Sequence, residues 1–591
     1  MFLAEASGGN FSSLYKRAKS SRTLSVPLQI FEDHCKKLFM HLEAPALPFL
    51  PLNYDSTHPI MLEIQELETL QAINKQRSKA CSYNGISPLH IKELKDELSA
   101  ILTQTFNGCL KSCTFPLCWL ELVMFFLHKK GPRDDANNYR SIAVENPIYK
   151  VFSTIMNDRL VEYAETQKLM PDFQFGFVRN RNTLGAIALL REIVARRLDN
   201  KKRTYVAFID FKKAFDSIDR SKLLCKLQQF GIPIDFCNLL HFVLKNMKVY
   251  LKTEDVFSEP IETTTGVLQG DVLSPTLFNL FTSDLPDQLK HEGVHLDAVG
   301  VKYIMYADDL CLIAPNGKDL QVALDCLEKY CDKNNLTVNT KKSKLVIFHK
   351  GRLPYKQSVL ERVNEFSYLG ISLTSQMSFS SHIQSIVMRA NSRIGLLYSK
   401  LDLQNMPIDV VKRVFSCYIL PIFQYALVIW ISGKFSSSSE QLVNGLFTKF
   451  WKRYLNIPLS TSNALTYYLA ETMPLIAILR KLIKQATGSI YLPCCLSGVQ
   501  LSFFNDLNTG EEANDFDWSS IPSFFWRSRT IWKLPAKQKY RKNCVVKSVI
   551  QIIMKSVRQP HSMLNLTLIV FVNAVNATYM LIMSLTTSAM P

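Results

Sequence analysis

Three aspartates that adjoin apolar runs are the residues of this sequence best suited to chemistry. Asp210 ends the apolar run 205–209, while Asp308 and Asp309 stand between two further apolar runs. A carboxylate at the end of a buried strand is costly unless it has a partner or a metal ion. Oxygen ligands of this kind suit Mg²⁺, which also binds substrate phosphates. Two such ions could activate a hydroxyl and stabilise a leaving pyrophosphate, so the acids predict metal-dependent phosphoryl transfer.

Strands must bring these acids together. The continuously apolar residues 205–209 predict a buried central strand. The apolar residues on both sides of Tyr306-Ala307-Asp308-Asp309 predict a tight β-hairpin with the acids at its tip. An isolated Asp-Asp pair is commonly a solvated loop, but such a loop needs no apolar support on both sides. Asp219 is expected to cap the helix that follows the first strand.

Residues 266–275 form a third candidate segment with the sequence Gly-Val-Leu-Gln-Gly-Asp-Val-Leu-Ser-Pro. Gly266 and Gly270 allow the backbone to approach a ligand closely, and the amide of Gln269 could position a template or nucleotide. Ser274 followed by Pro275 predicts the start of a helix. Taken alone, the segment is better explained as a turn before an amphipathic helix.

The composition restricts the partners and the compartment. An excess of 69 Lys and Arg over 51 Asp and Glu gives a net charge of +18, which favours nucleic acid, although a soluble basic protein or a membrane-surface binder is also compatible. The 14 cysteines show no zinc-ligand spacing. No secretory signal is recognised, so we expect a nuclear and cytoplasmic protein that is not secreted. Residues 564–585 are apolar but contain three Asn, so a membrane span is less expected than a buried helix or an unrelated tail.

The order of these segments resembles motifs A, B and C of reverse transcriptases, and the flanking blocks are similar to those of non-LTR (LINE-type) retrotransposons. Further blocks that carry this resemblance are Asn84-Gly-Ile-Ser-Pro88, Leu127-His-Lys129-Lys130-Gly131, Asn138-Tyr-Arg140-Ser-Ile142, Gln174-Phe-Gly176-Phe177, residues 336–344, residues 366–370 and residues 418–430. The resemblance covers about residues 79–430, with the motifs in order. It departs from the usual pattern at Cys81-Ser82-Tyr83-Asn84, where a Pro-Gly-Pro-Asp type of sequence is common.

The resemblance implies an α+β, right-hand polymerase fold of fingers, palm and thumb with a helical C-terminal extension. The implied domains are residues 1–78, an N-terminal extension without a recognisable motif; 79–200, the fingers; 201–365, the palm with motifs A, B, C and D; 366–480, the primer grip, thumb and following helical region; and 481–591, a C-terminal tail of unknown role. Within these ranges a helix is expected near residues 383–401, and a second helical stretch near 410–430 is expected to be interrupted by Pro421. Residues 436–439 are expected to form a polar linker.

The resemblance also implies roles for individual residues. Asp210, Asp308 and Asp309 would be the catalytic acids and would hold two Mg²⁺ ions, with Mn²⁺ as a possible substitute. The implied nucleotide-binding residues are Lys129, Arg140, Phe215, Gln269, Gly270 and Lys342, with Lys130 as an alternative to Lys129, and Lys341 and Lys344 as alternatives to Lys342. For Lys129 and Arg140 the other interpretation is that they are ordinary surface cations. The implied primer grip comprises Tyr368, Leu369 and Gly370.

Phe215 bears on the choice of sugar. It lies five residues after Asp210, where reverse transcriptases carry an aromatic ring that would clash with a ribose 2′-hydroxyl. Plain core packing is the alternative for a Phe at this position. The sequence Tyr306-Ala307-Asp308-Asp309 also differs from the Gly-Asp-Asp common in viral RNA-dependent RNA polymerases. DNA is therefore the expected product.

The expected function is that of an RNA-directed DNA polymerase of a non-LTR retrotransposon, with an RNA template, a DNA primer and dNTPs as partners and no membrane. One alternative is a catalytically decayed relic that still binds nucleic acid, and another is a reverse transcriptase like that of group II introns. No endonuclease constellation and no zinc knuckle is recognised. The sequence is therefore expected to be a truncated or decaying copy that kept its catalytic palm.

Overall fold

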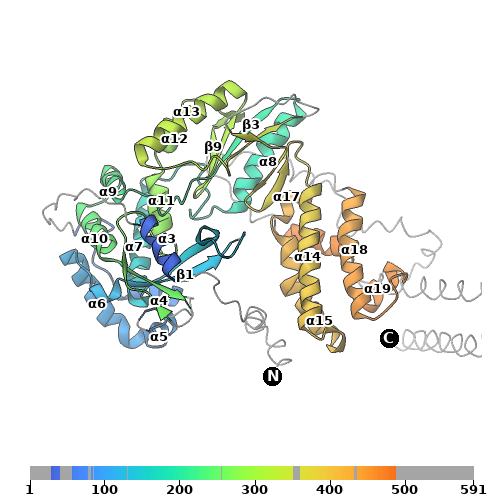
Figure 1. Cartoon of the computed structure of the whole chain (residues 1–591), viewed down its shortest axis with the longest axis horizontal. Coiled ribbons are helices and arrows are strands. Elements are labelled where there is room, and N and C mark those ends of the chain that lie inside the picture. The colour runs from blue at the N-terminus through green and yellow to red at the C-terminus, as the bar shows by residue number, and fades with distance from the viewer. Residues whose placement is uncertain are drawn as a thin grey trace, which may run out of the picture. The chain divides into compact units, whose positions relative to one another are not determined.

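The computed structural model describes residues 28–39, 56–76, 82–83, 85–129, 131–253, 256–349, 360–431 and 436–486. These residues form an α+β protein with two compact units (Figure 1). The larger unit includes residues 10–382 and contains the sheets, while the smaller unit includes residues 383–486 and is helical. The expected mixture of helix and sheet is confirmed.

The main sheet of the larger unit has five strands in the order β12-β11-β3-β10-β9. Their bounds are β3 Thr204–Ile209, β9 Tyr303–Tyr306, β10 Asp309–Ala314, β11 Lys344–Phe348 and β12 Glu361–Arg362. Strand β3 lies between two antiparallel neighbours, and its residues Val206 and Ala207 are fully buried. The continuous apolar run thus forms the predicted buried central strand. Helices α8 (Thr183–Asp199) and α13 (Gly317–Asn334) pack against this sheet (Figure 1).

A second sheet has the order β2-β1-β4-β5, with β6 also paired to β4. Its strands are β1 Glu121–His128, β2 Tyr139–Val144, β4 Lys248–Thr253, β5 Val256–Phe257 and β6 Ile261–Glu262. Helix α3 (Leu28–Phe39) packs against β4 and β6, and the ring of Phe31 stacks on Phe126 with centroids 4.0 Å apart. A segment in which the sequence offered no motif therefore supplies a core helix, because its apolar face covers this sheet.

Further helices and short elements complete the larger unit. They are α4 Glu66–Lys75, α5 Pro88–Glu93, η1 Leu117–Trp119, α6 Lys95–Ser112, η2 Ala136–Asn138, α7 Pro147–Thr166, α9 Arg220–Gln229, α10 Ile234–Asn246, α11 Ser274–Phe281, α12 Leu285–Gln288, β7 Val294–Leu296, β8 Val299–Val301, β13 Glu365–Tyr368 and β14 Ile371–Thr374. The side chain of Asp219 accepts hydrogen bonds from the first turn of α9, and Pro275 occupies the first turn of α11. Both predicted helix starts are confirmed.

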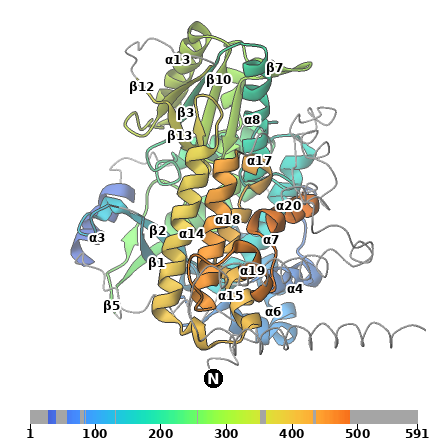
Figure 2. The same cartoon turned by 90° about the vertical axis from the view of Figure 1, so that its right-hand side faces the viewer.

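The smaller unit consists of packed helices. They are α14 Ser380–Lys400, which begins at the end of the larger unit, η3 Leu403–Asn405, α15 Ile408–Tyr418, α16 Leu420–Gln424, α17 Leu427–Ile431, α18 Ser437–Tyr454, α19 Asn463–Leu469 and α20 Leu475–Ala486. Helices α14 and α18 run side by side (Figure 2), and the Tyr398 hydroxyl donates a hydrogen bond to the Phe450 carbonyl at 3.0 Å. The helix expected near residues 383–401 is confirmed as α14. The second helical stretch is interrupted as expected, because α15 ends at Tyr418 and Pro421 lies in the first turn of the new helix α16.

The prediction of a polar linker at residues 436–439 is wrong. Ser436 is instead the N-cap of α18, and its hydroxyl accepts a hydrogen bond from the backbone N–H of Ser439 at 3.2 Å. A run of serines resembles a linker in composition, but a serine hydroxyl also satisfies the free N–H groups at a helix start.

Within the described ranges, no helix combines the length and the apolar character needed to cross a membrane. The apolar segment 564–585 lies outside those ranges, as does Asn84 of the first resembling block.

Candidate active site

The three predicted acids lie at one end of the main sheet. Strands β10 and β3 are antiparallel with Leu310 opposite Ile209, so the adjoining residues Asp309 and Asp210 lie at the same end of the pair. Strands β9 and β10 pair through Tyr306 and Asp309, which leaves Ala307 and Asp308 as a two-residue turn. The predicted tight hairpin is confirmed, and its turn brings the acid pair beside Asp210.

The charges of these acids repel one another. Loss of surrounding water raises the pKa of the Asp309 carboxyl to about 6, because it disfavours the ionised form. Repulsion by the negative charges of Asp308 and Asp210 adds to this shift. Burial also raises the pKa of Asp308, with Asp210 again contributing repulsion. A divalent cation would relieve this crowding of negative charge, so the carboxylates are chemically suited to one. Among the described residues, however, no three His, Cys, Asp or Glu side chains already form a metal-binding group.

The segment that follows α13 holds Asp210 in place. The Asn339 backbone N–H donates to the Asp210 carbonyl at 2.7 Å, and its side-chain amide donates to the Asp210 carboxylate at 2.9 Å. The Asp210 backbone N–H in turn donates to the Ser343 hydroxyl at 3.0 Å. Asn339 stands in one of the resembling blocks, but the sequence alone gave no reason to assign it to the site.

The position of Lys342 differs from that of its alternatives. Its ammonium lies 3.8 Å from the Asp210 carboxylate, although the lysine side chain is 66% exposed. Lys344 instead pairs with Glu361 at 2.5 Å. Of these two lysines, Lys342 is therefore the one next to the acids, and exposure leaves it free to follow a ligand. Lys341 is exposed.

Two predicted cations on the second sheet face the same region. Lys129 directly follows β1, and Arg140 lies on the paired strand β2. Burial lowers the pKa of Lys129, and the positive charges of Arg140 and Lys342 lower it further, while Asp210 acts in the opposite direction. Lys129 thus lies close enough to Arg140 and to Lys342 for both positive charges to repel it, and an anionic ligand would relieve that repulsion. The alternative Lys130 lies outside the described residues.

Phe215 lies on the loop after β3 and is partly exposed. Its ring stacks on Phe278 of α11, with centroids 4.6 Å apart and an angle of 22° between the rings. The Phe215 carbonyl accepts a hydrogen bond from Val267 at 2.9 Å, and Gly266 donates to Ile218 at 2.8 Å. The ring is therefore fixed from behind while one part of it stays accessible, which suits both a packing role and a contact with a ligand.

The loop that contains Gln269 and Gly270 docks on strand β2. The Ala143 backbone N–H donates to the Gln269 carbonyl at 2.8 Å. Gly270 has a φ of +115°, and a Cβ at this position would lie only 2.4 Å from the Ala143 carbonyl oxygen. This close approach requires glycine and anchors the loop three residues from Arg140.

The predicted primer-grip residues form the turn between β13 and β14. Leu369 and Gly370 both have positive φ, 45° and 82°, as a tight two-residue hairpin turn requires. Tyr368 is buried, and its ring lies 5.3 Å from that of Phe208 on β3. The turn is accessible to a ligand, whereas the Tyr368 side chain supports the sheet beneath the acids.

The sequence analysis did not identify several polar residues that are buried in the larger unit. Gln174 is 1% exposed and hydrogen-bonds the backbone of Ala307 in the turn between β9 and β10. Asp216 is buried beside Lys213, and burial raises its pKa to about 6. Glu145 is buried next to Asp271, and burial raises its pKa well above the usual range. The available signal was a polar side chain inside an apolar block, as with Gln174 between two phenylalanines.

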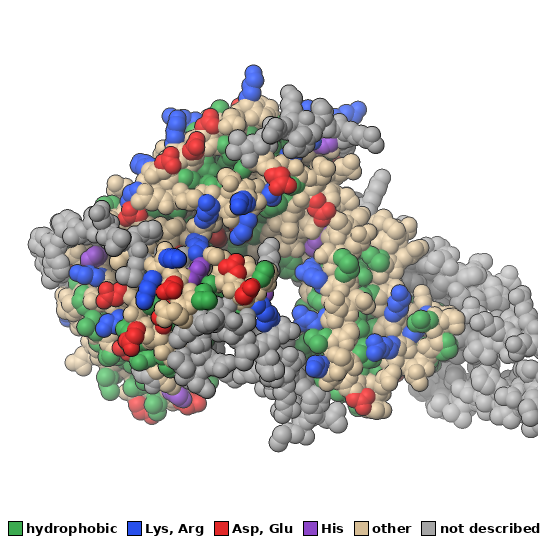
Figure 3. Space-filling model, viewed as in Figure 1, with side chains coloured by type: hydrophobic (Ala, Val, Ile, Leu, Met, Phe, Trp, Pro, Cys, Tyr) green, Lys and Arg blue, Asp and Glu red, His purple; other side chains and the backbone are tan. Residues whose placement is uncertain are grey.

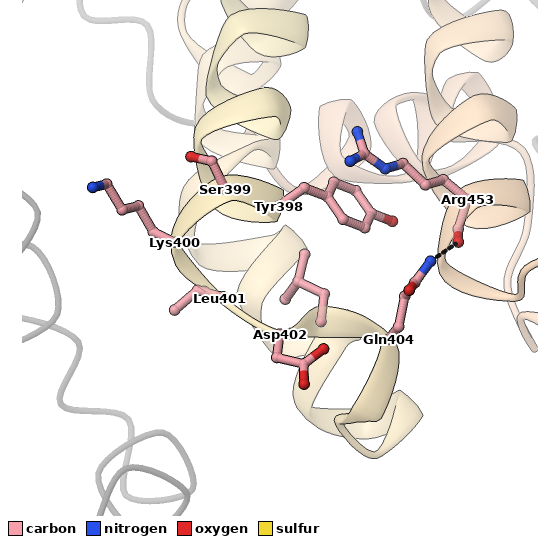
Figure 4. A pocket seen from close by; sticks show the side chains of 8 residues that line it. Tyr398, Ser399, Lys400, Leu401, Asp402, Gln404 and Arg453 are labelled. Carbon is pink, nitrogen blue, oxygen red and sulfur yellow. Dashed lines mark hydrogen bonds between the residues drawn. The ribbon is translucent and has the colours of Figure 1, made fainter.

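The surface and the cavities add two observations. Figure 3 shows several Lys and Arg side chains on the visible face of the larger unit, interspersed with Asp and Glu. In the smaller unit, a cavity of about 400 Å³ is lined by residues 398–404 and Arg453. The Arg453 guanidinium lies 4.0 Å from the centre of the Tyr398 ring, and the Gln404 amide donates to the Arg453 carbonyl at 3.2 Å (Figure 4). None of the predicted site residues lines this cavity.

Comparisons with known proteins bear on these observations. Residues 127–373 match the family model described as reverse transcriptase (RNA-dependent DNA polymerase). The similar proteins from Drosophila melanogaster include the probable RNA-directed DNA polymerase from transposon BS, which is 25% identical over 66% of this chain and 43% of its own length. They also include the RNA-directed DNA polymerase from mobile element jockey, which is 24% identical over 68% of this chain and 44% of its own length. The resemblance to non-LTR retrotransposon reverse transcriptases is confirmed, and the chain spans less than half the length of these relatives.

Solved structures add little to this result. A telomerase from Candida tropicalis matches with a TM-score of 0.34 and 11% identity, over 47% of this chain and 59% of that one.

Proposed function

We propose that this chain, which carries a reverse transcriptase domain related to those of non-LTR retrotransposons, extends a DNA primer with dNTPs on an RNA template. The observation that carries the proposal is the convergence of Asp210, Asp308 and Asp309 at one end of the main sheet. Cations from the second sheet and from the segment after α13 face these acids. Acids that repel one another beside cations form a site for metal ions and a triphosphate.

The proposed architecture is a right-hand polymerase. In it, residues 79–200 form the fingers, 201–365 the palm, and 366–480 the primer grip, thumb and following helices, with 1–78 and 481–591 as extensions. The acids on the main sheet support the palm assignment, and the cations Lys129, directly after β1, and Arg140, on β2, support the fingers. Strand β4 pairs with β1, so the sheet of the fingers also contains chain from the palm range, while α20 continues past residue 480.

In the proposed mechanism, Asp210, Asp308 and Asp309 would hold two Mg²⁺ ions, for which Mn²⁺ could substitute. When bound, such ions promote ionisation of the primer 3′-hydroxyl and neutralise charge on the leaving pyrophosphate. Lys129 and Arg140 bind the triphosphate of the incoming nucleotide, because Lys129 directly follows β1, Arg140 lies on the paired strand β2, and the charge of Lys129 interacts with those of Arg140 and Asp210.

Other residues of the chain orient the substrates. Phe215, held by Phe278, excludes a ribose 2′-hydroxyl, and the Gln269–Gly270 loop contacts the nascent base pair. Lys342 stays near the pyrophosphate as it leaves. The turn at Leu369 and Gly370 contacts the primer backbone, with the buried Tyr368 as its support.

The proposed partners are an RNA template, a DNA primer and dNTPs, and the proposed location is the nucleus and cytoplasm. A net charge of +18 supports binding to nucleic acid through phosphate contacts, which release counterions. Primer–template affinity is therefore expected to fall steeply between about 50 mM and 200 mM salt. An affinity that stays constant over this range would contradict electrostatic binding.

Primer extension on an RNA template with Mg²⁺ and dNTPs tests the proposed function. The wild type is expected to extend the primer, and Asp308→Asn is expected to lower the rate by roughly 10³-fold or more, because metal-assisted charge stabilisation contributes several kcal/mol. Asp332→Asn is the matched control, since it removes the same charge from an exposed position on α13. It is expected to leave the rate unchanged.

The test also separates the alternatives. A folded wild type that binds primer–template but never extends it would identify a nucleic-acid-binding relic. Extension that survives Asp308→Asn would contradict the assignment of the acids.

A further inference from the structure

We infer that Gln174 is a positioning residue, which holds the turn that carries the Asp308–Asp309 pair in a conformation that the turn would otherwise leave. The inference rests on the proposed function for its catalytic consequence, but its structural part can be tested independently. Gln174 stands in the block Gln174-Phe-Gly176-Phe177, far in sequence from the acids.

The turn itself is strained. Ala307 has a φ of +54°, in the left-handed region that residues with a Cβ seldom adopt. Such a residue persists only where its surroundings hold it. Asp308 directly follows Ala307, so the direction of its carboxylate depends on the backbone of this strained residue.

Gln174 supplies the contact that holds the turn. Its side-chain oxygen accepts one hydrogen bond from the Ala307 N–H at 3.0 Å and another from the Gly176 N–H at 2.8 Å. Gln174 is only 1% exposed, so water does not replace this acceptor readily. A single oxygen therefore ties the turn to the segment that Gln174 belongs to.

The backbone of the Gln174 segment runs alongside strand β9. Phe175 donates to the Met305 carbonyl at 2.7 Å, and Met305 donates to the Phe173 carbonyl at 2.9 Å. These two hydrogen bonds, formed by the residues on either side of Gln174, place Gln174 opposite Met305 and so set the position of its side chain along the hairpin. The side-chain oxygen consequently meets the first residue of the turn.

Gly176 shows how closely the two segments approach. A Cβ at this position would lie 2.3 Å from the Ala307 nitrogen, which no real contact allows. Gly176 is not among the glycines with positive φ, so proximity to the turn explains this glycine. Asn279 of α11 donates to the Gly176 carbonyl at 2.8 Å and secures the segment from its other side. The turn thus contacts a segment that is itself held by hydrogen bonds to α11 and to β9.

The first test removes the side-chain oxygen of Gln174, which accepts the hydrogen bond from the Ala307 N–H. Gln174→Met keeps the length of the side chain but cannot accept the Ala307 N–H. Hydrogen–deuterium exchange of the Ala307 amide is expected to accelerate at least about 10-fold in the folded variant. In primer extension, we expect kcat to fall by about 10–100-fold, the range typical for losing a residue that orients a metal ligand. We also expect the Mg²⁺ concentration for half-maximal rate to rise, while the KM for dNTP stays nearly constant.

A rescue experiment distinguishes positioning from general packing. Ala307→Gly relieves the strain of the turn, because glycine adopts a positive φ readily. Adding Ala307→Gly to Gln174→Met is therefore expected to restore part of the lost kcat and of the Mg²⁺ response. A residue that merely fills the core would show no such rescue, and absence of rescue would overturn the inference.

A steric variant covers the case in which Gln174→Met does not fold. Gly176→Ala pushes a methyl group against the Ala307 nitrogen, and it is expected to reproduce the loss of kcat and the raised Mg²⁺ requirement. Gly108→Ala is its control, because a Cβ there meets nothing within 4 Å. Equal activity of Gly176→Ala and the control would also overturn the inference.

The outcomes separate this inference from the proposed function. An active wild type with an unaffected Gln174→Met variant would overturn the inference alone. A folded but inactive wild type would overturn the proposed function, and the exchange of the Ala307 amide would still decide whether Gln174 holds the turn.

Discussion

Gly266→Ala probes how tightly the loop before α11 is attached to the segment that carries Phe215. Gly266 has a φ of +78°, and a Cβ there would lie 2.5 Å from the Asp216 carbonyl oxygen. Gly85 has almost the same φ, +79°, but a Cβ there meets nothing within 4 Å. Gly85→Ala therefore introduces the backbone strain without a steric clash. The difference in free energy of unfolding between the two variants measures the cost of the clash at residue 266.

The expected magnitudes follow from these contacts. Backbone strain alone should lower the free energy of unfolding by about 1–2 kcal/mol in both variants. In Gly266→Ala the new Cβ must also move from 2.5 Å to an ordinary contact beyond 3.4 Å, which pulls on the two hydrogen bonds that join Gly266 and Val267 to Ile218 and Phe215. Losing two such bonds adds about 1–3 kcal/mol. Gly266→Ala should therefore lose roughly 2–5 kcal/mol in total.

Urea unfolding followed by circular dichroism measures both losses, and primer extension measures their effect on function. Gly266→Ala is expected to extend primers poorly even where it is folded, because Phe215 and Asp216 move. Gly85→Ala is expected to extend normally. Equal losses of stability, together with normal extension by Gly266→Ala, would refute the view that this loop positions the Phe215 segment.

Three further predictions concern specificity, pH and charge. Phe215→Val should raise ribonucleotide incorporation relative to dNTPs by roughly 10–100-fold, the range for removing a steric contact, and an unchanged ratio in competition assays would contradict the gate. Burial, with repulsion from Asp271, raises the pKa of Glu145, so the folded protein keeps this group neutral while the unfolded chain ionises it near pH 4–5. The free energy of unfolding of the wild type, compared with that of Glu145→Gln, should therefore be greatest below that pH and should decrease as pH rises. Urea unfolding of both proteins at pH 5 and pH 8 measures this decrease. Lys342→Ala should slow extension by about 5–10-fold, in keeping with the loss of about 1 kcal/mol, whereas Lys344→Ala, which breaks a pair with a surface glutamate, should not.

The sequence was sufficient for the elements whose pattern is local. The unbroken apolar run 205–209 predicted a buried strand, and the structure places it at the centre of the main sheet. Asp219 and Pro275 marked helix starts because capping depends on a few neighbouring residues. The serines at 436–439 show the limit of composition, since the same residues suit a linker and a helix N-cap.

The candidate acids could also be identified from the sequence, and their catalytic roles remain predictions. Their convergence follows from two local patterns, a strand that ends in Asp210 and a hairpin with Asp308 and Asp309 at its tip. The segment 28–39 offered no motif, yet it forms a helix on the second sheet. The sequence of an amphipathic helix shows that one face is buried, but not which sheet that face packs against.

What the tertiary structure alone decided is the set of residues that hold the acids in place. Asn339 contacts Asp210 across 129 residues of chain, and Gln174 contacts Ala307 across 133. The sequence determined the strands, the hairpin and the acids because apolar periodicity and turn formation depend on neighbours along the chain. A hydrogen bond between distant segments depends on their register and spacing in space, and no local pattern carries that information. The strain at Ala307 and the glycine at 176 became interpretable only once the two backbones were seen in contact.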